Sequence, residues 1–245
     1  MSIFIRLRGG LGNQMFQYAS ALRLSHEKNK KLIIDDFSGF LNDKEYQRSF
    51  MLDYFYVTSA KIFDNKIFSL IYLIKFKLFF FLNKRLYINT FNYFDDNFSI
   101  TDISFYKKKN VYLNGLWQDF KYFDHLKNKI SKEFTLKKRY RVNILNSFKN
   151  FNPNNSVAVH IRNYDKKQKQ KKNNLPELYY LRAFEYIVKK IKNPKFYVFS
   201  DDVRYVNFLL KNFKYDFIIV NNLSSENNEI IDFNLMSQFK NFIVA

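Results

Sequence analysis

Arg-Gly-Gly-Leu-Gly-Asn-Gln-Met-Phe-Gln-Tyr-Ala, residues 8–19, decides the fold because it joins a strand to a helix. Before it, residues 3–7 have the composition of a short buried strand. After it, Met15, Ala19 and Leu22 have the spacing of one helical face. Three of the chain's five glycines lie in the turn, where glycine allows positive φ and the close approach of a ligand. Because free N–H groups at a helix start attract anions, the turn is either an anion site or a plain tight turn.

Strands and helices alternate along the chain. Residues 31–36 form a second strand, so that the first 36 residues make a strand–helix–strand unit with parallel pairing. Residues 111–123 are expected to form a strand that enters a turn. Further strands are expected at 156–161, 196–200, 217–220 and 241–245, and helices at 67–82, 124–150, 176–192, 203–211 and 230–238. In the helix at 176–192, one face is expected to carry Leu181, Phe184, Val188 and Ile191. The turn-rich residues 152–155 mark a boundary between two α/β domains, residues 1–152 and 153–245.

The composition excludes some classes of site and leaves others open. The chain has 245 residues and no cysteine, so neither disulfides nor thiolate metal sites can form. Its three histidines are far apart and no D-x-D pair occurs, so we expect no metal. The net charge of +19 suits a polyanionic partner, but lysines on a solvated surface, written by an AT-rich genome, explain it equally well. The rival class is a basic nucleic-acid-binding protein.

A membrane span is not expected. No signal peptide is visible, because Met1 leads almost directly into the first strand. The most apolar run, residues 67–82, contains Lys75 and Lys77 and is shorter than the roughly 20 residues of a spanning helix. We therefore expect a core or interfacial helix there, and a cytoplasmic protein whose membrane contact would be peripheral, at the inner face of the plasma membrane.

Polar residues follow a strand in the second half of the chain. His160 lies near the end of the strand at 156–161, and Arg162 and Asp165 lie beyond it. Ligands of open α/β sheets bind beyond the carboxyl ends of the strands, so this segment is well placed for a site. Arg162 can present a planar fork to phosphate oxygens, which lysine cannot mimic. The alternative is an arginine paired with a nearby carboxylate.

The next strand ends in Ser200, Asp201 and Asp202, at the same ligand-facing edge. A carboxylate there can accept two hydrogen bonds from a ligand. The alternative is a helix N-cap, which either aspartate could supply for a helix beginning at Val203. The two roles can exist on adjacent residues.

Five segments in order along the chain resemble one family, the bacterial α-1,2-fucosyltransferases of glycosyltransferase family 11. They are residues 8–19; residues 111–123, with Gly115, Gln118, Lys121, Tyr122 and Phe123 in place; residues 157–165; residues 195–202; and residues 232–237 together with 242–245. The third is similar to the family motif H-x-R-R-G-D, with His160, Arg162 and Asp165 matching. Asn163 stands at the second arginine of that motif and Tyr164 at its glycine.

The resemblance implies a fold and a reaction. The fold is two Rossmann-like domains facing across a cleft, the GT-B-like arrangement, with the acceptor on the first domain and GDP-fucose on the second. The reaction is inverting transfer of L-fucose from GDP-β-L-fucose to the 2-hydroxyl of galactose in a surface-polysaccharide or lipopolysaccharide glycan. The implied partners are a sugar nucleotide and a galactose-terminated acceptor, which can be lipid-linked, with no nucleic acid, no metal and no other cofactor.

The resemblance also implies roles for particular residues. Arg162 and His160 are the catalytic candidates, with Arg162 meeting the diphosphate and Asp201 lying near the guanine. The implied donor-binding set is Gly10, Gly12, Asn13, Arg162, Asp165, Ser200, Asp201 and Asp232. Three positions also have a purely structural alternative. Trp117 can be a core aromatic, and Asp232 can be a helix-surface carboxylate. The basic residues 166–172 can be either a solvated loop or a phosphate clamp.

Family members continue past the segment that matches residues 242–245. On that resemblance the second domain is expected to be incomplete, and the 245-residue chain to bind GDP-fucose weakly. An inactive donor-binding remnant is the alternative to an active enzyme.

Overall fold

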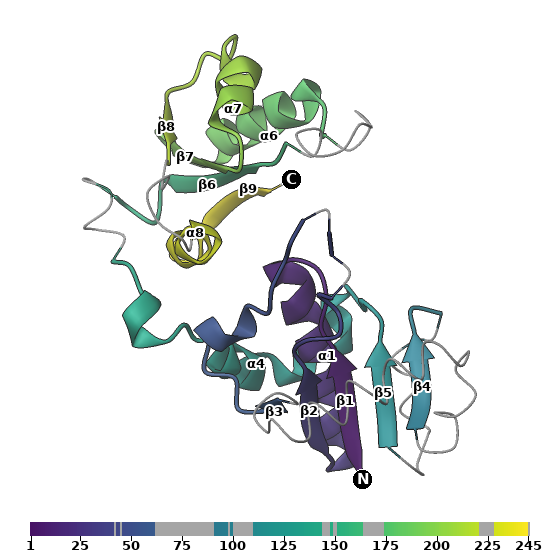
Figure 1. Cartoon of the computed structure of the whole chain (residues 1–245). Helices are drawn as coiled ribbons and strands as arrows, with labels where there is room; N and C mark the ends of the chain where they lie inside the picture. The colour runs from purple at the N-terminus through teal and green to yellow at the C-terminus, as the bar shows by residue number, and fades with distance from the viewer. Residues whose placement is uncertain are drawn as a thin grey trace. The chain divides into compact units, whose positions relative to one another are not determined.

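The computed structural model describes residues 1–41, 43–44, 46–61, 91–97, 99, 110–143, 148, 151–163, 174–220 and 228–244. The chain divides into two compact units, residues 1–137 and 138–245. Both are α/β units built on parallel sheets, which confirms the predicted fold class (Figure 1). The division falls earlier than the turn at 152–155, because Phe148 and Phe151 already pack in the second unit, against the ring of Tyr197. The apolar run at 67–82 lies outside the described residues.

The first unit contains a five-stranded sheet in the order β3-β2-β1-β5-β4, in which every pair is parallel. The strands are β1 (Ser2–Arg6), β2 (Lys31–Asp35), β3 (Ala60–Lys61), β4 (Phe91–Asp95) and β5 (Asn110–Asn114). The chain winds outward from β1 through β2 to β3, and then β4 and β5 fill the other side. The order therefore reverses between β1 and β5, the two strands at the middle of the sheet.

Helices and short 3-10 turns accompany this sheet. They are α1 (Leu11–Lys28), α4 (Lys127–Glu133), η1 (Leu52–Tyr54), η3 (Phe120–Tyr122), η4 (Asp124–Leu126) and, at the start of the second unit, η5 (Lys138–Tyr140). The predicted face of α1 is largely correct, because Ala19 and Leu22 are buried. The helix ends where Asn29 adopts the left-handed conformation, a common C-terminal cap. The long helix expected at 124–150 is confirmed only for the seven residues of α4.

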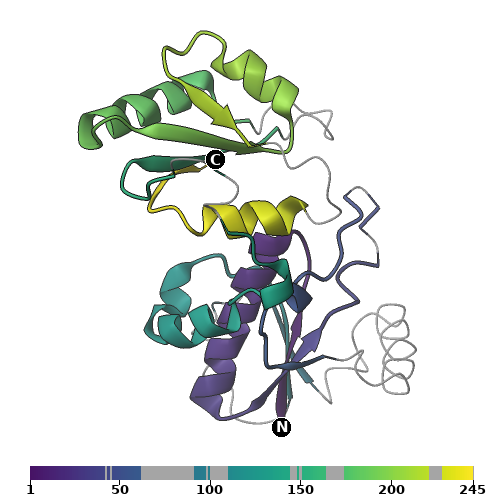
Figure 2. The ribbon, with the colours of Figure 1, turned by 90° about the vertical axis from the view of Figure 1, so that its left-hand side faces the viewer.

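The second unit has a four-stranded parallel sheet in the order β8-β7-β6-β9. The strands are β6 (Ser156–Ile161), β7 (Lys195–Ser200), β8 (Phe217–Ile219) and β9 (Asn241–Val244), and the helices are α6 (Glu177–Lys190), α7 (Val203–Leu210) and α8 (Asn228–Met236). Helices α6 and α7 cover one face and α8 covers the other, as Figures 1 and 2 both show. Alternate residues of β6 divide accordingly: Val157 and Val159 pack toward α6 and α7, and Ala158 packs toward α8.

The buried face of α6 differs from the prediction. Tyr180 and Phe184 are buried, whereas Leu181 and Val188 are about 40% exposed. The helix turns its aromatic side chains inward because Phe184 packs edge-on against Phe196 on the sheet. The prediction is therefore correct for Phe184 and Ile191, which pack in the core, and wrong for Leu181 and Val188.

Among the described residues, no helix combines the length and apolar character required to cross a bilayer.

The turn after β2 contacts the turn after β1 at one glycine. A Cβ atom on Gly39 would lie 1.8 Å from the carbonyl oxygen of Leu7 and 3.0 Å from the Cβ of Arg8. These neighbours are backbone and near-backbone atoms, which cannot rotate away. Gly39 is therefore required by the close approach of two chain segments.

We expect Gly39→Ala to destabilise the first unit by roughly 1–3 kcal/mol, the usual cost of overpacking. Gly12→Ala is the matched control, because no atom lies within 4 Å of a Cβ at Gly12 and alanine suits a helix better than glycine. Urea denaturation can be followed by the fluorescence of Trp117, the chain's one tryptophan, which lies in the first unit. Equal midpoints for the two variants would contradict the close approach at Gly39.

Candidate functional site

The strand order of the second unit places a site at the carboxyl end of β6. From β6 the chain proceeds through α6 to β7 and through α7 to β8, on one side of the sheet. It then returns through α8 to β9, on the other side of β6. Where the order reverses in an open parallel sheet, the helices diverge and leave room for a ligand beyond the carboxyl ends of the strands. His160 and Arg162 occupy this position.

His160 is the last side chain of β6 on the face that α8 covers. It pairs with Phe199 of β7 and Val244 of β9, so it stands on the central strand at the point of reversal. Burial lowers the pKa of His160, and the positive charge of Arg162 lowers it further, while the charge of Asp201 acts in the opposite direction. The imidazole is therefore neutral near pH 7, with one donor and one acceptor nitrogen.

The two aspartates after β7 have different roles. Asp202 is the N-cap of α7, since its Oδ1 accepts the backbone N–H groups of Arg204 and Tyr205, both at 3.1 Å. Asp201 is exposed, and its Oδ1 accepts the backbone N–H of Asn163 at 3.0 Å. Of the two alternatives in the sequence, the cap therefore falls to Asp202, and Asp201 presents its carboxylate at the edge of the sheet.

Asn163 ties the end of β6 to the end of β7. Its side-chain nitrogen Nδ2 donates to Oδ2 of Asp202 at 3.0 Å, and its side-chain oxygen Oδ1 accepts from the side chain of Asn174 at 3.1 Å. Together with the backbone bond to Asp201, these contacts fix the chain directly after Arg162. The residue that departs from the family motif is thus a structural bridge.

The structure brings four predicted residues of the second unit together. His160, Arg162, Ser200 and Asp201 all lie at the carboxyl ends of β6 and β7. Ser200 shapes the turn there, because its Oγ accepts the backbone N–H of Asp202 at 3.1 Å. Asp232 instead lies on α8, half-buried, with a role that the fold alone does not define. Asp165 and the basic loop at 166–172 lie outside the described residues.

The glycine turn in the first unit is built differently from the prediction. Among the described residues, the one glycine with positive φ is Gly9, at 79°, where a Cβ would lie 2.5 Å from the side-chain nitrogen of Asn13. Gly10 is the N-cap of α1 in an extended conformation, and Gly12 belongs to the first helical turn with open space above it. The helix start has neither a side-chain cap nor an acidic residue in its first turn. It therefore keeps the properties of an anion site.

Asn13 lies at the place where the first sheet reverses its order. Its side-chain oxygen accepts a hydrogen bond of 2.6 Å from the side chain of Gln118, which follows β5. Arg8 also joins this edge through an ion pair of 2.8 Å with Asp96, just after β4. The loops after β1, β4 and β5 thus meet at the carboxyl edge of the sheet, as the switch-point rule requires of a ligand site.

Two glutamines of the segment at residues 8–19 have structural roles that sequence reasoning missed. Gln17 is fully buried and clamps Arg8, accepting its backbone N–H at 2.9 Å and donating to its carbonyl at 3.1 Å. Gln14, also fully buried, donates to the carbonyls of Gly9 and Ser49 and accepts the N–H of Met51. Their spacing, which places both on the buried side of a predicted helix, is the signal that could have identified them.

Trp117 is 7% exposed, which confirms the interpretation as a core aromatic. Its indole lies over Gly115, where a Cβ would approach the ring to 2.7 Å. Within the described part of the chain, no three His, Asp or Glu side chains gather closely enough to hold a metal ion.

Comparison with known proteins identifies relatives across the whole length. The model of Glycosyl transferase family 11 matches residues 2–245. An Alpha-1,2-colitosyltransferase of Escherichia coli is 32% identical over 268 aligned positions, covering 100% of this chain and 84% of that protein. The O-antigen biosynthesis glycosyltransferase WbnK of Escherichia coli is 28% identical and covers 98% of this chain and 85% of that protein.

A solved structure shares the fold. The NodZ alpha-1,6-fucosyltransferase, in crystals soaked with GDP-fucose, has a TM-score of 0.54 and 14% sequence identity, covering 99% of this chain and 87% of that one. At this identity the likeness concerns the fold alone, which is GT-B-like.

We expect the pKa of His160 to lie below its ordinary value of about 6.5, because burial and Arg162 both disfavour the imidazolium. Arg162→Gln removes a repelling cation and should raise this pKa, whereas Asp201→Asn removes an attracting carboxylate and should lower it. NMR titration of the imidazole resonances, assigned with a His160→Gln variant, measures all three proteins. A pKa that does not respond to Arg162→Gln would contradict the arrangement.

Proposed function

Because the chain belongs to glycosyltransferase family 11, we propose that it transfers L-fucose from GDP-β-L-fucose to a galactose 2-hydroxyl. The acceptor in this proposal is a galactose-containing glycan of the surface-polysaccharide or lipopolysaccharide type, and the product is an α-1,2 linkage. The colitosyltransferase relative carries the same linkage in its name, and WbnK carries the O-antigen in its name. Both names support the choice of linkage and acceptor class.

The observation that carries the proposal is the position of Arg162 at the switch point of the second sheet. A guanidinium directly beyond β6 can present two parallel N–H donors to a diphosphate at the place where such sheets bind nucleotides. His160 beside it is neutral, so it adds hydrogen bonds without adding a second buried charge. The exposed carboxylate of Asp201 at the neighbouring strand end is our candidate for the guanine edge.

The reaction forms one bond at C1 of fucose and breaks another. The galactose 2-oxygen forms a bond to C1 of fucose as the bond from C1 to the β-phosphate oxygen breaks, and GDP leaves with that electron pair. Attack opposite to the leaving group inverts the β-linked donor to an α-linked product. The hydroxyl proton passes to a base or through a solvent relay. Negative charge grows on the departing diphosphate, and Arg162 is the group that we propose meets it.

The first unit contributes acceptor binding in this proposal. The side chains of Asn13 and Gln118 hold each other at the carboxyl edge of its sheet. Since the amide of Gln118 donates to the oxygen of Asn13, the nitrogen of Asn13 stays oriented as a donor over Gly9. A fixed amide donor at this edge suits a sugar oxygen.

A second candidate donor is favoured by the 32% identical relative, whose name specifies colitose. Colitose lacks the 3-hydroxyl of fucose, so the two donors share the nucleotide and differ in one hydrogen-bonding group. An enzyme that hydrogen-bonds that hydroxyl should reject colitose strongly, whereas one that leaves it in solvent should accept both. The donor sugar is therefore decided by a direct comparison of the two.

We expect product from lactose and GDP-fucose in the presence of excess EDTA, because the scheme assigns the diphosphate charge to Arg162 and not to a divalent ion. The assay would compare GDP-fucose with GDP-colitose at equal concentrations, with the linkage read by NMR of the product. If chelation abolishes transfer and Mn²⁺ or Mg²⁺ restores it, the metal-independent scheme is wrong. If colitose alone is transferred, the fucose assignment is wrong and the colitose one stands.

Arg162→Ala should lower kcat/KM by roughly 10²–10³-fold, the usual loss when one preorganised transition-state donor is removed. Arg162→Lys should restore part of the rate, because an ammonium keeps the charge but loses the paired geometry. Arg204→Ala is the matched control, since Arg204 is exposed on the neighbouring helix and its backbone N–H, which alanine keeps, donates to Asp202. An alanine variant at position 162 with undiminished kcat/KM would remove Arg162 from the mechanism.

A further inference from the structure

The first unit contains a cavity at the edge of its sheet opposite to the glycine turn. It has a volume of about 460 Å³ and is lined by α1, by α4 and by the starts of β2 and β3. Lys31 and Ala60, which begin those two strands, lie on its rim. Since parallel strands begin at the edge opposite to the one where they end, this cavity is separate from the turn at Gly9–Asn13. Its size falls in the usual range of roughly 300–1,000 Å³ for small-ligand sites.

A buried carboxylate reaches the cavity from α4. Glu133 is 6% exposed, and three donors orient it: the backbone N–H of Thr58 at 2.8 Å, the hydroxyl of Thr58 at 2.6 Å and the hydroxyl of Tyr18 at 3.0 Å. Burial raises the pKa of Tyr18 well above its ordinary value, and the charge of Glu133 also acts to raise it, so the phenol stays a donor. A carboxylate offers about four acceptor positions, so Glu133 has capacity for a further hydrogen bond.

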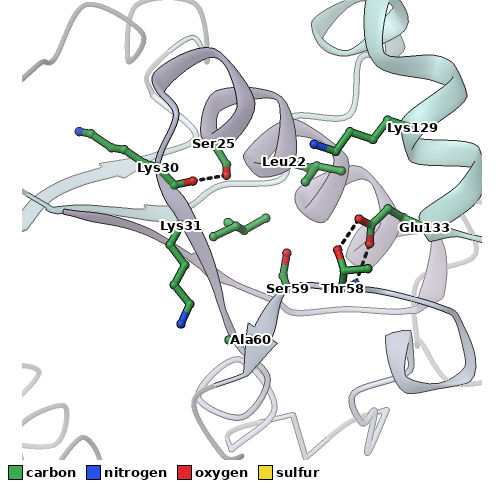
Figure 3. Close-up of a pocket in the computed structure, with 10 residues that line it drawn as sticks. Leu22, Ser25, Lys30, Lys31, Thr58, Ser59, Ala60, Lys129 and Glu133 are labelled. Carbon is green, nitrogen blue, oxygen red and sulfur yellow. Dashed lines mark hydrogen bonds between the residues drawn. The ribbon is translucent and has the colours of Figure 1, made fainter.

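A cation enters the cavity from the same helix as this carboxylate. Lys129 precedes Glu133 by one helical turn, and Figure 3 shows its ammonium directed over Leu22, apart from the carboxylate of Glu133. The hydroxyl of Ser59 points into the same space from the segment before β3 (Figure 3). The floor is apolar because it is formed by Leu22 and Leu32, which are each about 5% exposed. Lys30 and Lys31 also line the cavity, but Figure 3 shows their side chains extending away from Lys129 and Glu133. The space between Lys129 and Glu133 thus combines an acceptor, a charged donor, a hydroxyl and an apolar floor.

This combination selects the charge of a ligand. An anion would meet the carboxylate of Glu133 at close range in a poorly solvated position, and a cation would meet the ammonium of Lys129. A neutral molecule with several hydroxyl groups satisfies both, since each hydroxyl can donate to a carboxylate and accept from an ammonium. A sugar ring also has an apolar C–H face, which matches a floor made of leucine.

We propose that this cavity is a second saccharide-binding site, which holds one neutral sugar unit between Glu133 and Lys129 over Leu22 and Leu32. Its hydroxyls donate to Glu133 and to the oxygen of Ser59, whose own proton is donated to Tyr18 at 2.9 Å, and they accept from Lys129. The site makes no use of Arg162 or Asn13, so saccharide binding here is independent of the proposed transfer reaction and remains testable if that reaction is absent.

The test is NMR titration of the isotope-labelled full chain at pH 6.5 with three probes that share one ring: galactose, galacturonate and galactosamine. We expect galactose to produce saturable shifts of the amide signals of Thr58, Ser59 and Lys129, with millimolar affinity. The anionic and cationic probes should bind several-fold more weakly. The proposal would be overturned if these three amides showed no saturable shifts with galactose. It would also be overturned if galacturonate or galactosamine bound more tightly than galactose.

Two variants separate the site from nonspecific contact. Lys129→Ala should weaken galactose binding about tenfold, as expected for the loss of one hydrogen bond to a charged group. Lys132→Ala is the control, because Lys132 is exposed on the same helix and does not line the cavity. Since Lys129 is exposed, its variant should fold normally even where Glu133→Gln does not. Equal affinity in the two lysine variants would also overturn the proposal.

Discussion

Parallel pairing is the constraint on which the rest of this structure depends. Every strand pair in both described sheets is parallel, so all strand carboxyl ends of a sheet share one edge. In each sheet one strand also lies between two strands that the chain reaches at different stages: β1 lies between β2 and β5, and β6 lies between β7 and β9. At these two places diverging connections leave the central strand ends uncovered, and polar side chains can stand there without being forced into a core. The glycine turn and the His160–Arg162 segment occupy these two positions.

The central strands were predictable from sequence, and the outer strands of the first sheet were not. β1, β2, β5, β6 and β7 carry apolar runs bounded by turns, because they are largely buried on both faces. β8 and β9 carry apolar runs too, although each exposes part of its length. β3 has only two residues, and β4 lies within an aromatic, Lys-rich stretch that offers no contrast between core and surface positions. Each of these two strands pairs with only one neighbouring strand in the described sheet. Their strand conformation therefore depends on that pairing and not on a local sequence pattern.

Within the candidate site, the sequence predicts which polar groups follow β6 and β7, but not which aspartate caps α7. Either Asp201 or Asp202 could cap α7, and only the hydrogen-bond geometry assigns the cap to Asp202. The buried glutamines are harder to foresee, because their partners are distant in sequence. Gln14, for example, binds the backbone of Met51 across 37 positions. Such long-range contacts between side chain and backbone leave no local period in the sequence.

The bridge made by Asn163 constrains how this site can change. Its backbone and side chain contact Asp201, Asp202 and Asn174 at once, so the residue is coupled to three positions on two other segments. An arginine at position 163, as the family motif has it, could not reproduce the amide's simultaneous donation and acceptance. Substitution there would leave Asn174 without that amide oxygen and place a long cation against the cap of α7. The effects of mutations at positions 163, 174 and 202 should therefore be non-additive. An arginine at position 163 would require compensating substitutions at the other two positions.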